Sequence, residues 1–140
     1  MADTSKLAFP DPQERVPAIL VAEDEVLIRF VIADYLRECG FQVIEASSGD
    51  EAVSILESTV SVDLIFTDVQ MPGSRDGFEL AQWVRANRPG VPVLLTSGDA
   101  KKAATAKQLC ENEPFFAKPY EVAQVVAQIR QHLEMRKSQA

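Results

Sequence analysis

The sequence predicts an α/β fold, in which five helices flank a five-stranded parallel sheet. Short apolar segments alternate with segments whose apolar residues recur at helical spacing, and this alternation occurs five times. The apolar segments are continuous rather than alternating with polar residues, which indicates strands buried on both faces, as in parallel sheets. The length of 140 residues suits a single domain with a core of its own.

The first three expected elements are a strand, a helix and a strand. Residues 18–22 read AILVA and predict a buried strand, and residues 25–38 predict a helix. The expected core stripe of this helix consists of Ile28, Val31, Ile32, Tyr35 and Leu36. Gly40 suits the helix end, because glycine readily adopts the left-handed conformation found there. Residues 41–46 predict the second strand.

The rest of the chain repeats this pattern. The further expected elements are a helix opening at 47–50, a strand at 63–67, a loop rich in proline and glycine at 71–77, a helix near 77–87, a strand at 91–96, a helix near 100–111, a strand at 115–117 and a helix at about 120–134. Asp76 is expected to cap the helix that begins at Gly77. We expect residues 1–16 to be a mobile leader, 17–134 the folded domain and 135–140 a frayed tail.

The composition argues against several classes of partner. Lys and Arg number 14 and Asp and Glu 21, which leaves a net charge of −7. Nucleic acids and anionic membranes both attract basic surfaces, so neither is an expected partner. No apolar run reaches the roughly 18 residues of a membrane span, and the N-terminus does not read as a signal peptide. The two cysteines are too few for a disulfide framework, so a cytoplasmic location is expected.

Polar residues that suit phosphoryl chemistry follow the predicted strands. They are Glu23, Asp24, Asp68, Ser97 and Lys118. Because the carboxyl ends of parallel strands meet at one edge of the sheet, we expect these side chains to lie close together. Three carboxylates require a cation, and all-oxygen ligation suits Mg²⁺. Such a set is able to transfer a phosphoryl group, with a carboxylate as nucleophile and the lysine and the hydroxyl as donors to phosphoryl oxygens.

Four motifs in this order resemble the receiver domains of bacterial response regulators, the CheY-like domains of two-component systems. They are ILVAED at 19–24, DLIFTDVQMPG at 63–73, LLTSG at 94–98 and AKPY at 117–120. The resemblance covers roughly residues 17–134 and implies a flavodoxin-like sheet with the strand order 2-1-3-4-5. Because little sequence remains outside this range, we expect a stand-alone receiver with no output domain.

The resemblance assigns roles to the acidic residues. Asp68 would accept the phosphoryl group from a histidine kinase or a histidine phosphotransfer protein. Asp24 would bind Mg²⁺ directly and Glu23 largely through water, while Asp68 and the backbone carbonyl of Gln70 would complete the ligands. The loop that follows, MPGSRDG at 71–77, is one residue longer than the MPGMDG pattern of the family, and we expect this to change how the loop closes over the metal.

The resemblance also assigns the remaining site residues. Lys118 would hold the phosphoryl group, with Pro119 after it in the cis form, and Ser97 would be the hydroxyl that moves toward the phosphate. Thr96 is the alternative to Ser97, although neighbours in a strand point to opposite sides. Phe115 occupies the position of the aromatic switch, where many members carry a tyrosine whose hydroxyl phenylalanine lacks.

A second apolar stripe on the helix at 25–38 goes beyond the family pattern. It consists of Val26, Phe30 and Ala33. A helix that packs on one side of a sheet does not need two stripes. We hypothesise that this one docks a helical partner, such as the helical hairpin of a histidine kinase or a phosphotransfer protein. The alternative is that it packs on the last helix.

Three other functions fit the residues less well. A phosphatase of the haloacid dehalogenase type needs a carboxylate two residues after its nucleophile, where this chain has Gln70. A flavodoxin needs a phosphate loop after its first strand, where this chain has acids at 23–25. A pseudo-receiver would not need the complete set of acids, serine and lysine. The resemblance to receiver domains instead implies a signalling protein with intrinsic self-phosphorylation and autodephosphorylation, whose output uses protein contacts at roughly 99–134 or phosphate shuttling.

Overall fold

The computed structural model describes residues 15–98 and 115–139. All strands lie in one parallel sheet with the order β2-β1-β3-β4-β5, which confirms the predicted sheet. The elements are β1 (Ala18–Ala22), α2 (Val26–Glu38), β2 (Gln42–Ala46), α3 (Gly49–Glu57), β3 (Leu64–Asp68), α4 (Gly77–Asn87), β4 (Val93–Ser97), β5 (Phe115–Ala117) and α6 (Val122–Gln139). The described residues thus contain four helices; the helix expected near 100–111, and most of the expected leader, lie outside them.

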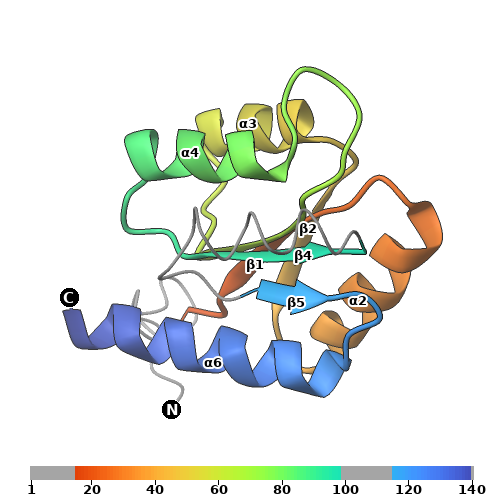
Figure 1. The fold of residues 1–140 in the computed structure, drawn as a ribbon. Coiled ribbons are helices and arrows are strands. Elements are labelled where there is room, and N and C mark those ends of the chain that lie inside the picture. Colours follow the sequence, from red (N-terminus) through yellow and green to blue (C-terminus); the bar gives the residue numbers. More distant parts are fainter. Residues whose placement is uncertain (1–14, 99–114, 140) are drawn as a thin grey trace, which may run out of the picture.

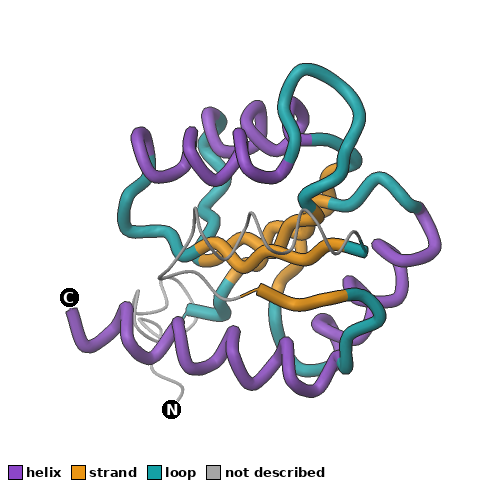
Figure 2. Tube along the Cα trace, viewed as in Figure 1, coloured by secondary structure: helices purple, strands orange, loops and turns teal. Residues whose placement is uncertain are grey.

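The helices cover both faces of the sheet. Helices α3 and α4 lie on one face, and α2 and α6 lie on the other (Figures 1 and 2). Alternate residues of the central strands supply the two cores: Leu20 and Ile65 pack with α3 and α4, and Ile19 and Phe66 pack with α2 and α6. Every residue of β1, β3 and β4 is buried, which explains why their sequences are continuously apolar up to the polar strand ends.

Local sequence signals set several helix ends. Ser48 accepts a hydrogen bond from the backbone N–H of Glu51 at the start of α3. At the start of α4, Asp76 and Glu79 form a reciprocal capping box, which confirms the predicted cap. Gly40 follows the end of α2 with a φ of 96°, the left-handed conformation expected there.

Helix α6 continues beyond its predicted end. It extends from Val122 to Gln139, past the end expected near residue 134, and the expected fraying of the segment stays a prediction. Arg136 gives a reason, because its guanidinium lies 2.8 Å from the carbonyl oxygen of Asp63 and 3.3 Å from the Asp63 carboxylate. In the part of the chain that the structure describes, no helix is both long and apolar enough to cross a membrane.

The orientation of α2 differs from the prediction. Its buried residues are Ile32, Ala33 and Leu36, whereas Val31 and Tyr35 of the expected core stripe are exposed. Ala33 was expected on the docking stripe and is wholly buried, so that assignment is wrong. Val26 and Phe30 of the same stripe are exposed, which also rules out packing of these two side chains on α6.

Arg29 explains why apolar periodicity misplaced this face. Its guanidinium donates to the backbone oxygen of Glu23 at 2.8 Å and to the carboxylate of Glu45 on β2 at 3.2 Å. The side chain is largely buried, so a paired charge occupies the sheet-facing side of the helix. A stripe drawn from apolar residues alone leaves arginine out. The predicted core face of α2 is therefore turned away from the observed one, which contains Arg29 and Ala33.

Candidate functional site

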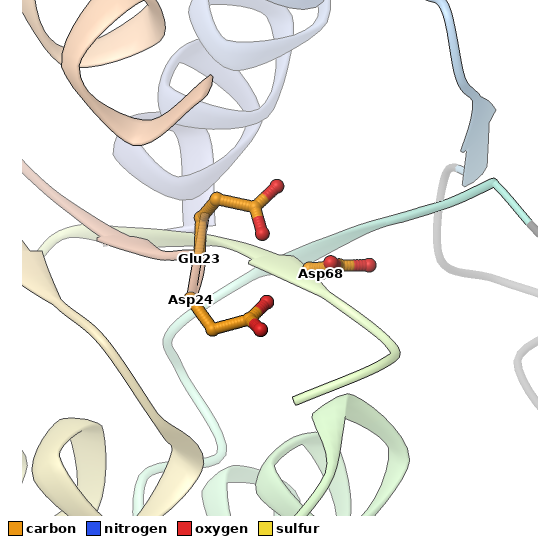
Figure 3. Close-up of side chains that lie close together, drawn as sticks. All are labelled: Glu23, Asp24 and Asp68. Atoms are coloured by element: carbon orange, nitrogen blue, oxygen red, sulfur yellow. The ribbon is translucent and has the colours of Figure 1, made fainter. Parts of the chain in front are cut away.

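Three carboxylates meet at the carboxyl edge of the sheet. Glu23 and Asp24 follow β1, and Asp68 is the last residue of the neighbouring strand β3 (Figure 3). One carboxylate oxygen from each residue lies within 4.8 Å of the other two. Glu23 and Asp68 are only 3% and 4% exposed, whereas Asp24 is open to solvent. The prediction that parallel strands bring these acids together is confirmed by this geometry.

Lys118 supplies a positive charge at the same edge. Its Nζ donates to Glu23 Oε1 at 2.6 Å and to Asp68 Oδ2 at 3.1 Å. The residue follows β5, where its backbone N–H bonds to the carbonyl of Ser97, and its peptide bond to Pro119 is cis, as the family resemblance implies. Burial alone would lower the pKa of Lys118, but the hydrogen bonds to Glu23 and Asp68 raise it above its ordinary value. Lys118 is therefore a cation at neutral pH.

Glu23 is the residue whose protonation is most changed by this environment. Burial raises the pKa of its carboxyl group to about 7, and the nearby charge of Asp68 acts in the same direction. The hydrogen bond from Lys118 opposes this change and keeps the pKa from rising further. Near neutral pH the cluster therefore exchanges a proton easily, and a bound cation would displace that proton.

Two hydroxyl residues lie at the end of β4. Ser97 is the last residue of the strand and pairs with Ala117, next to Lys118. Thr96 lies opposite Asp68 in the β3–β4 register, and its buried hydroxyl has no hydrogen-bond partner within the described residues. Ser97 stays the predicted donor to a phosphoryl oxygen, and Thr96 stays the alternative.

The loop after Asp68 forms the second wall of the site. The backbone N–H of Gln70 donates to Asp68 Oδ1 at 3.2 Å. At the far end of the loop, Gly77 packs so closely on the backbone of Asp68 that a Cβ atom would collide with its carbonyl oxygen. A cavity of about 500 Å³ separates the loop from Asp24; its lining consists of Asp24, Gln70, Met71, Pro72, Gly73, Asp76 and Glu79.

Sequence reasoning missed two residues that support the site. Arg29 holds the backbone oxygen of Glu23, and Asp50 on α3 binds the loop at Ser74 and Arg75. Neither residue follows a strand or belongs to a motif. Asp50 and its loop partners are far apart in the sequence, and no periodicity connects them.

The comparison with protein families decides what kind of domain this is. The family model for the response regulator receiver domain matches residues 19–130, which include the acidic cluster and, apart from Ala18, all strand residues that the structure describes. This chain belongs to the response regulator receiver domain family. The acids, the lysine and the loop are therefore parts of a receiver domain.

Known receiver domains that this chain is similar to occur in two kinds of protein. The transcriptional regulatory protein PdtaR of Mycobacterium tuberculosis is 33% identical over 121 residues, which are 85% of this chain and 58% of PdtaR. The sensor kinase CckA of Brucella abortus is 31% identical over 118 residues, which are 83% of this chain and 12% of the kinase. A receiver protein structure from Sinorhizobium medicae has a TM-score of 0.79 at 28% identity, covering 87% of this chain and 98% of that one.

An exposed apolar surface of the receiver domain lies beside this site. Val26, Leu27, Phe30 and Val31 of α2 are 60% to 80% exposed, and we refer to them as the α2 patch. A pocket of about 510 Å³ continues the patch; its lining consists of Leu27, Ile28, Val31, Ile32, Lys118, Pro119, Tyr120 and Val122. The pocket therefore connects the α2 patch to Lys118 at the acidic cluster.

The predicted aromatic switch lies on the other face of the sheet. Phe115 is half-buried and packs against the core beneath α3 and α4. Its neighbour Phe116 packs edge to face on Phe66 in the opposite core, with ring centroids 6.1 Å apart. A switching role for Phe115 stays a prediction.

Proposed function

We propose that this receiver domain accepts a phosphoryl group on Asp68, in a reaction that requires Mg²⁺ bound by Glu23, Asp24, Asp68 and the backbone carbonyl of Gln70. One observation carries the proposal: a buried carboxylate lies between two further carboxylates and the ammonium of Lys118. The donor would be a histidine kinase or a histidine phosphotransfer protein. Sensor kinases such as CckA, part of which matches this chain, support that class of donor.

The donor set fits Mg²⁺. The carboxylates of Glu23, Asp24 and Asp68 offer oxygen ligands within 4.8 Å of one another, and the cavity beside Asp24 leaves space for water ligands. Mg²⁺ prefers few protein oxygens and several waters, often together with a phosphoryl group. When bound, Mg²⁺ supplies positive charge that offsets the carboxylates and the phosphoryl oxygens.

The side chains then have separate tasks. A carboxylate oxygen of Asp68 attacks phosphorus and forms an O–P bond, while the bond to the donor nitrogen or acyl oxygen breaks and its electron pair leaves with the donor. Lys118, already within hydrogen-bond distance of Asp68, donates to a phosphoryl oxygen. Ser97 at the end of β4 supplies a hydroxyl donor to another oxygen.

Intact mass measurement tests this proposal. Incubation with acetyl phosphate and Mg²⁺ should add one phosphoryl group, and peptide mapping should place it on Asp68. EDTA should abolish the addition, because the three carboxylates repel the incoming phosphoryl oxygens without a cation. The absence of any adduct, together with no binding of beryllofluoride, would contradict the proposal.

Metal affinity should depend on pH because Glu23 titrates near neutrality. A proton on Glu23 competes with the cation, so we expect Mg²⁺ to bind more tightly as pH rises through about 7. The stability of the metal-free protein should change in the opposite direction. Between the ordinary pKa of 4.5 and about 7, folded Glu23 keeps a proton that the unfolded chain has lost, so the free energy of unfolding falls as pH rises.

Calorimetric titrations with Mg²⁺ on either side of neutral pH measure the first effect. Chemical unfolding in EDTA across the same range measures the second. Equal Mg²⁺ affinity at acid and alkaline pH would contradict the assignment of Glu23 as a group that shares the metal site. The exposed Glu38, at the end of α2, offers a control substitution to glutamine that should leave both profiles unchanged.

We also propose that the α2 patch docks the phosphodonor protein. The patch is apolar and exposed, and its pocket extends to Lys118, so a helical partner seated there would place its phosphohistidine beside Asp68. Large exposed apolar patches of this kind commonly mark protein interfaces. Val26 and Phe30 of the stripe expected from the sequence lie in the patch together with Leu27 and Val31, whereas Ala33 is buried.

The variant Phe30→Ala tests the docking proposal. Loss of a central aromatic contact costs about 1–2 kcal/mol of binding, so transfer from a phosphorylated kinase or phosphotransfer protein should slow by about 5- to 30-fold. Phosphorylation by acetyl phosphate should not change. Val60→Ala is the matched control, because Val60 is exposed outside the patch. Equal losses with both donors would contradict docking at α2.

A further inference from the structure

The carboxylate of Asp50 holds the apex of the loop that follows Asp68. It accepts hydrogen bonds from the backbone N–H of Ser74 at 3.0 Å and from the Ser74 hydroxyl at 2.6 Å. It also forms an ion pair with Arg75 at 3.1 Å. The hydrogen bonds from Ser74 hold the pKa of Asp50 below its ordinary value, so the group is ionised at neutral pH. We call this set of contacts the Asp50 clamp.

The backbone around the clamp is closely packed. A Cβ atom on Gly49 would lie 2.6 Å from the carbonyl oxygen of Arg75, so the loop rests directly on the start of α3. Gly73 has a φ of 97°, and a Cβ atom there would lie 2.7 Å from Asp50 Oδ2. Two glycines therefore permit the loop to reach α3, and Asp50 keeps it there.

The clamped segment is also a wall of the acidic site. At its base, the N–H of Gly77 bonds to the carbonyl of Val69 at 2.8 Å, and the N–H of Gln70 bonds to Asp68. Between base and apex, the loop faces Asp24 across the cavity of about 500 Å³. The loop is thus held at its base by the backbone after β3 and at its apex by Asp50 on α3.

We propose that Asp50 is a positioning residue for the metal site, which sets Mg²⁺ affinity by holding the loop that carries Gln70. This inference rests on the proposed function. Asp50 does not touch the acids itself; it acts through Ser74, Arg75 and the intervening backbone. Without the clamp, the loop would no longer be held on α3, so the Gln70 carbonyl would be less well placed to bind a cation and the ordering of the loop would oppose binding.

Three variants separate loop positioning from charge. Asp50→Ala removes the clamp and one negative charge. Asp50→Asn removes the same charge but keeps an oxygen that accepts from Ser74. Glu51→Ala removes a negative charge from the same helical turn, and the Glu51 carboxylate bonds to Ser47 rather than to the loop. Each variant is titrated with Mg²⁺ in a calorimeter, melted in EDTA and phosphorylated with acetyl phosphate.

We expect Asp50→Ala to raise the Kd for Mg²⁺ about fivefold, below the roughly 10- to 100-fold typical of residues that bond directly to metal ligands. Asp50→Asn should restore most of this affinity, and Glu51→Ala should change it less than twofold. Equal weakening in all three variants would show a charge effect and overturn the proposal. A lower melting temperature of Asp50→Ala with unchanged Mg²⁺ affinity would also overturn it. Wild-type protein that binds no Mg²⁺ would reject the proposed function itself.

Discussion

Asp68→Asn should abolish phosphorylation by every donor and should leave the metal-free fold at least as stable as the wild type. The amide has nearly the shape of the carboxylate but cannot act as the nucleophile. Three carboxylates and one ammonium meet here, so the substitution lowers the net negative charge of the cluster. Removing a buried like charge stabilises the cluster more than the weakened attraction to Lys118 destabilises it, because Lys118 keeps its shorter bond to Glu23.

Two measurements check the Asp68 prediction. Intact mass after incubation with acetyl phosphate and Mg²⁺ should show no adduct, and the melting temperature in EDTA should stay equal or rise by about 2–5 °C. Asp34→Asn is the matched control, since Asp34 is exposed on α2 and the same chemical change there should preserve the adduct. A phosphorylated Asp68→Asn protein would show that another residue is the acceptor.

Lys118→Met should impair both stability and phosphorylation. Methionine fills a similar volume but leaves Glu23 and Asp68 buried without their cation. Removal of one partner from a buried ion pair costs about 3–5 kcal/mol. The ammonium of Lys118 is partly exposed, so we expect a loss of about 2–4 kcal/mol at alkaline pH. Loss of one preorganised donor should slow phosphorylation by about 100-fold.

The stability loss of Lys118→Met should vary with pH and with Mg²⁺. Below the pKa of Glu23, about 7, the carboxyl group is neutral and needs its cation less, so the loss should shrink. Mg²⁺ binds the folded protein and should recover part of the loss. Urea unfolding on both sides of pH 7, with and without Mg²⁺, measures these effects. A phosphorylation rate equal to that of the wild type would contradict the role of Lys118.

Arg136→Met provides the control for this experiment. Arg136 pairs with Asp63 at the amino end of β3, away from the acidic cluster, and its side chain is about one-third exposed. A partly exposed ion pair contributes about 1 kcal/mol or less. We therefore expect a small loss of stability and an unchanged phosphorylation rate for this variant.

Much of the fold was predictable because its signals are local. Buried strands flanked by helices require continuous apolar segments, and those of β1, β3 and β4 are visible in the sequence. The facing of α2 was not predictable in the same way. A buried Arg29, neutralised by Glu45 and the backbone of Glu23, occupies the side that an apolar stripe was expected to fill.

The members of the site were predictable for a related reason. Glu23, Asp68 and Lys118 each terminate or follow a strand, and a parallel sheet brings such positions together. The pKa of Glu23 was not predictable from the sequence, because it depends on how deeply the carboxyl group is buried and on its distances to Asp68 and Lys118. The roles of Asp68, Ser97 and Phe115 stay predictions.

The sequence is enough to predict the parallel sheet, the acidic edge and the resemblance to receiver domains, since each depends on residues that are neighbours along the chain or repeat at strand and helix periods. The folded structure was needed to find the rotation of α2, the exposure of its patch and the Asp50 clamp. These features depend on pairs such as Arg29 with Glu45 and Asp50 with Ser74. The interaction energies of these pairs depend on distance and burial in the folded structure, which the order of residues along the chain does not show.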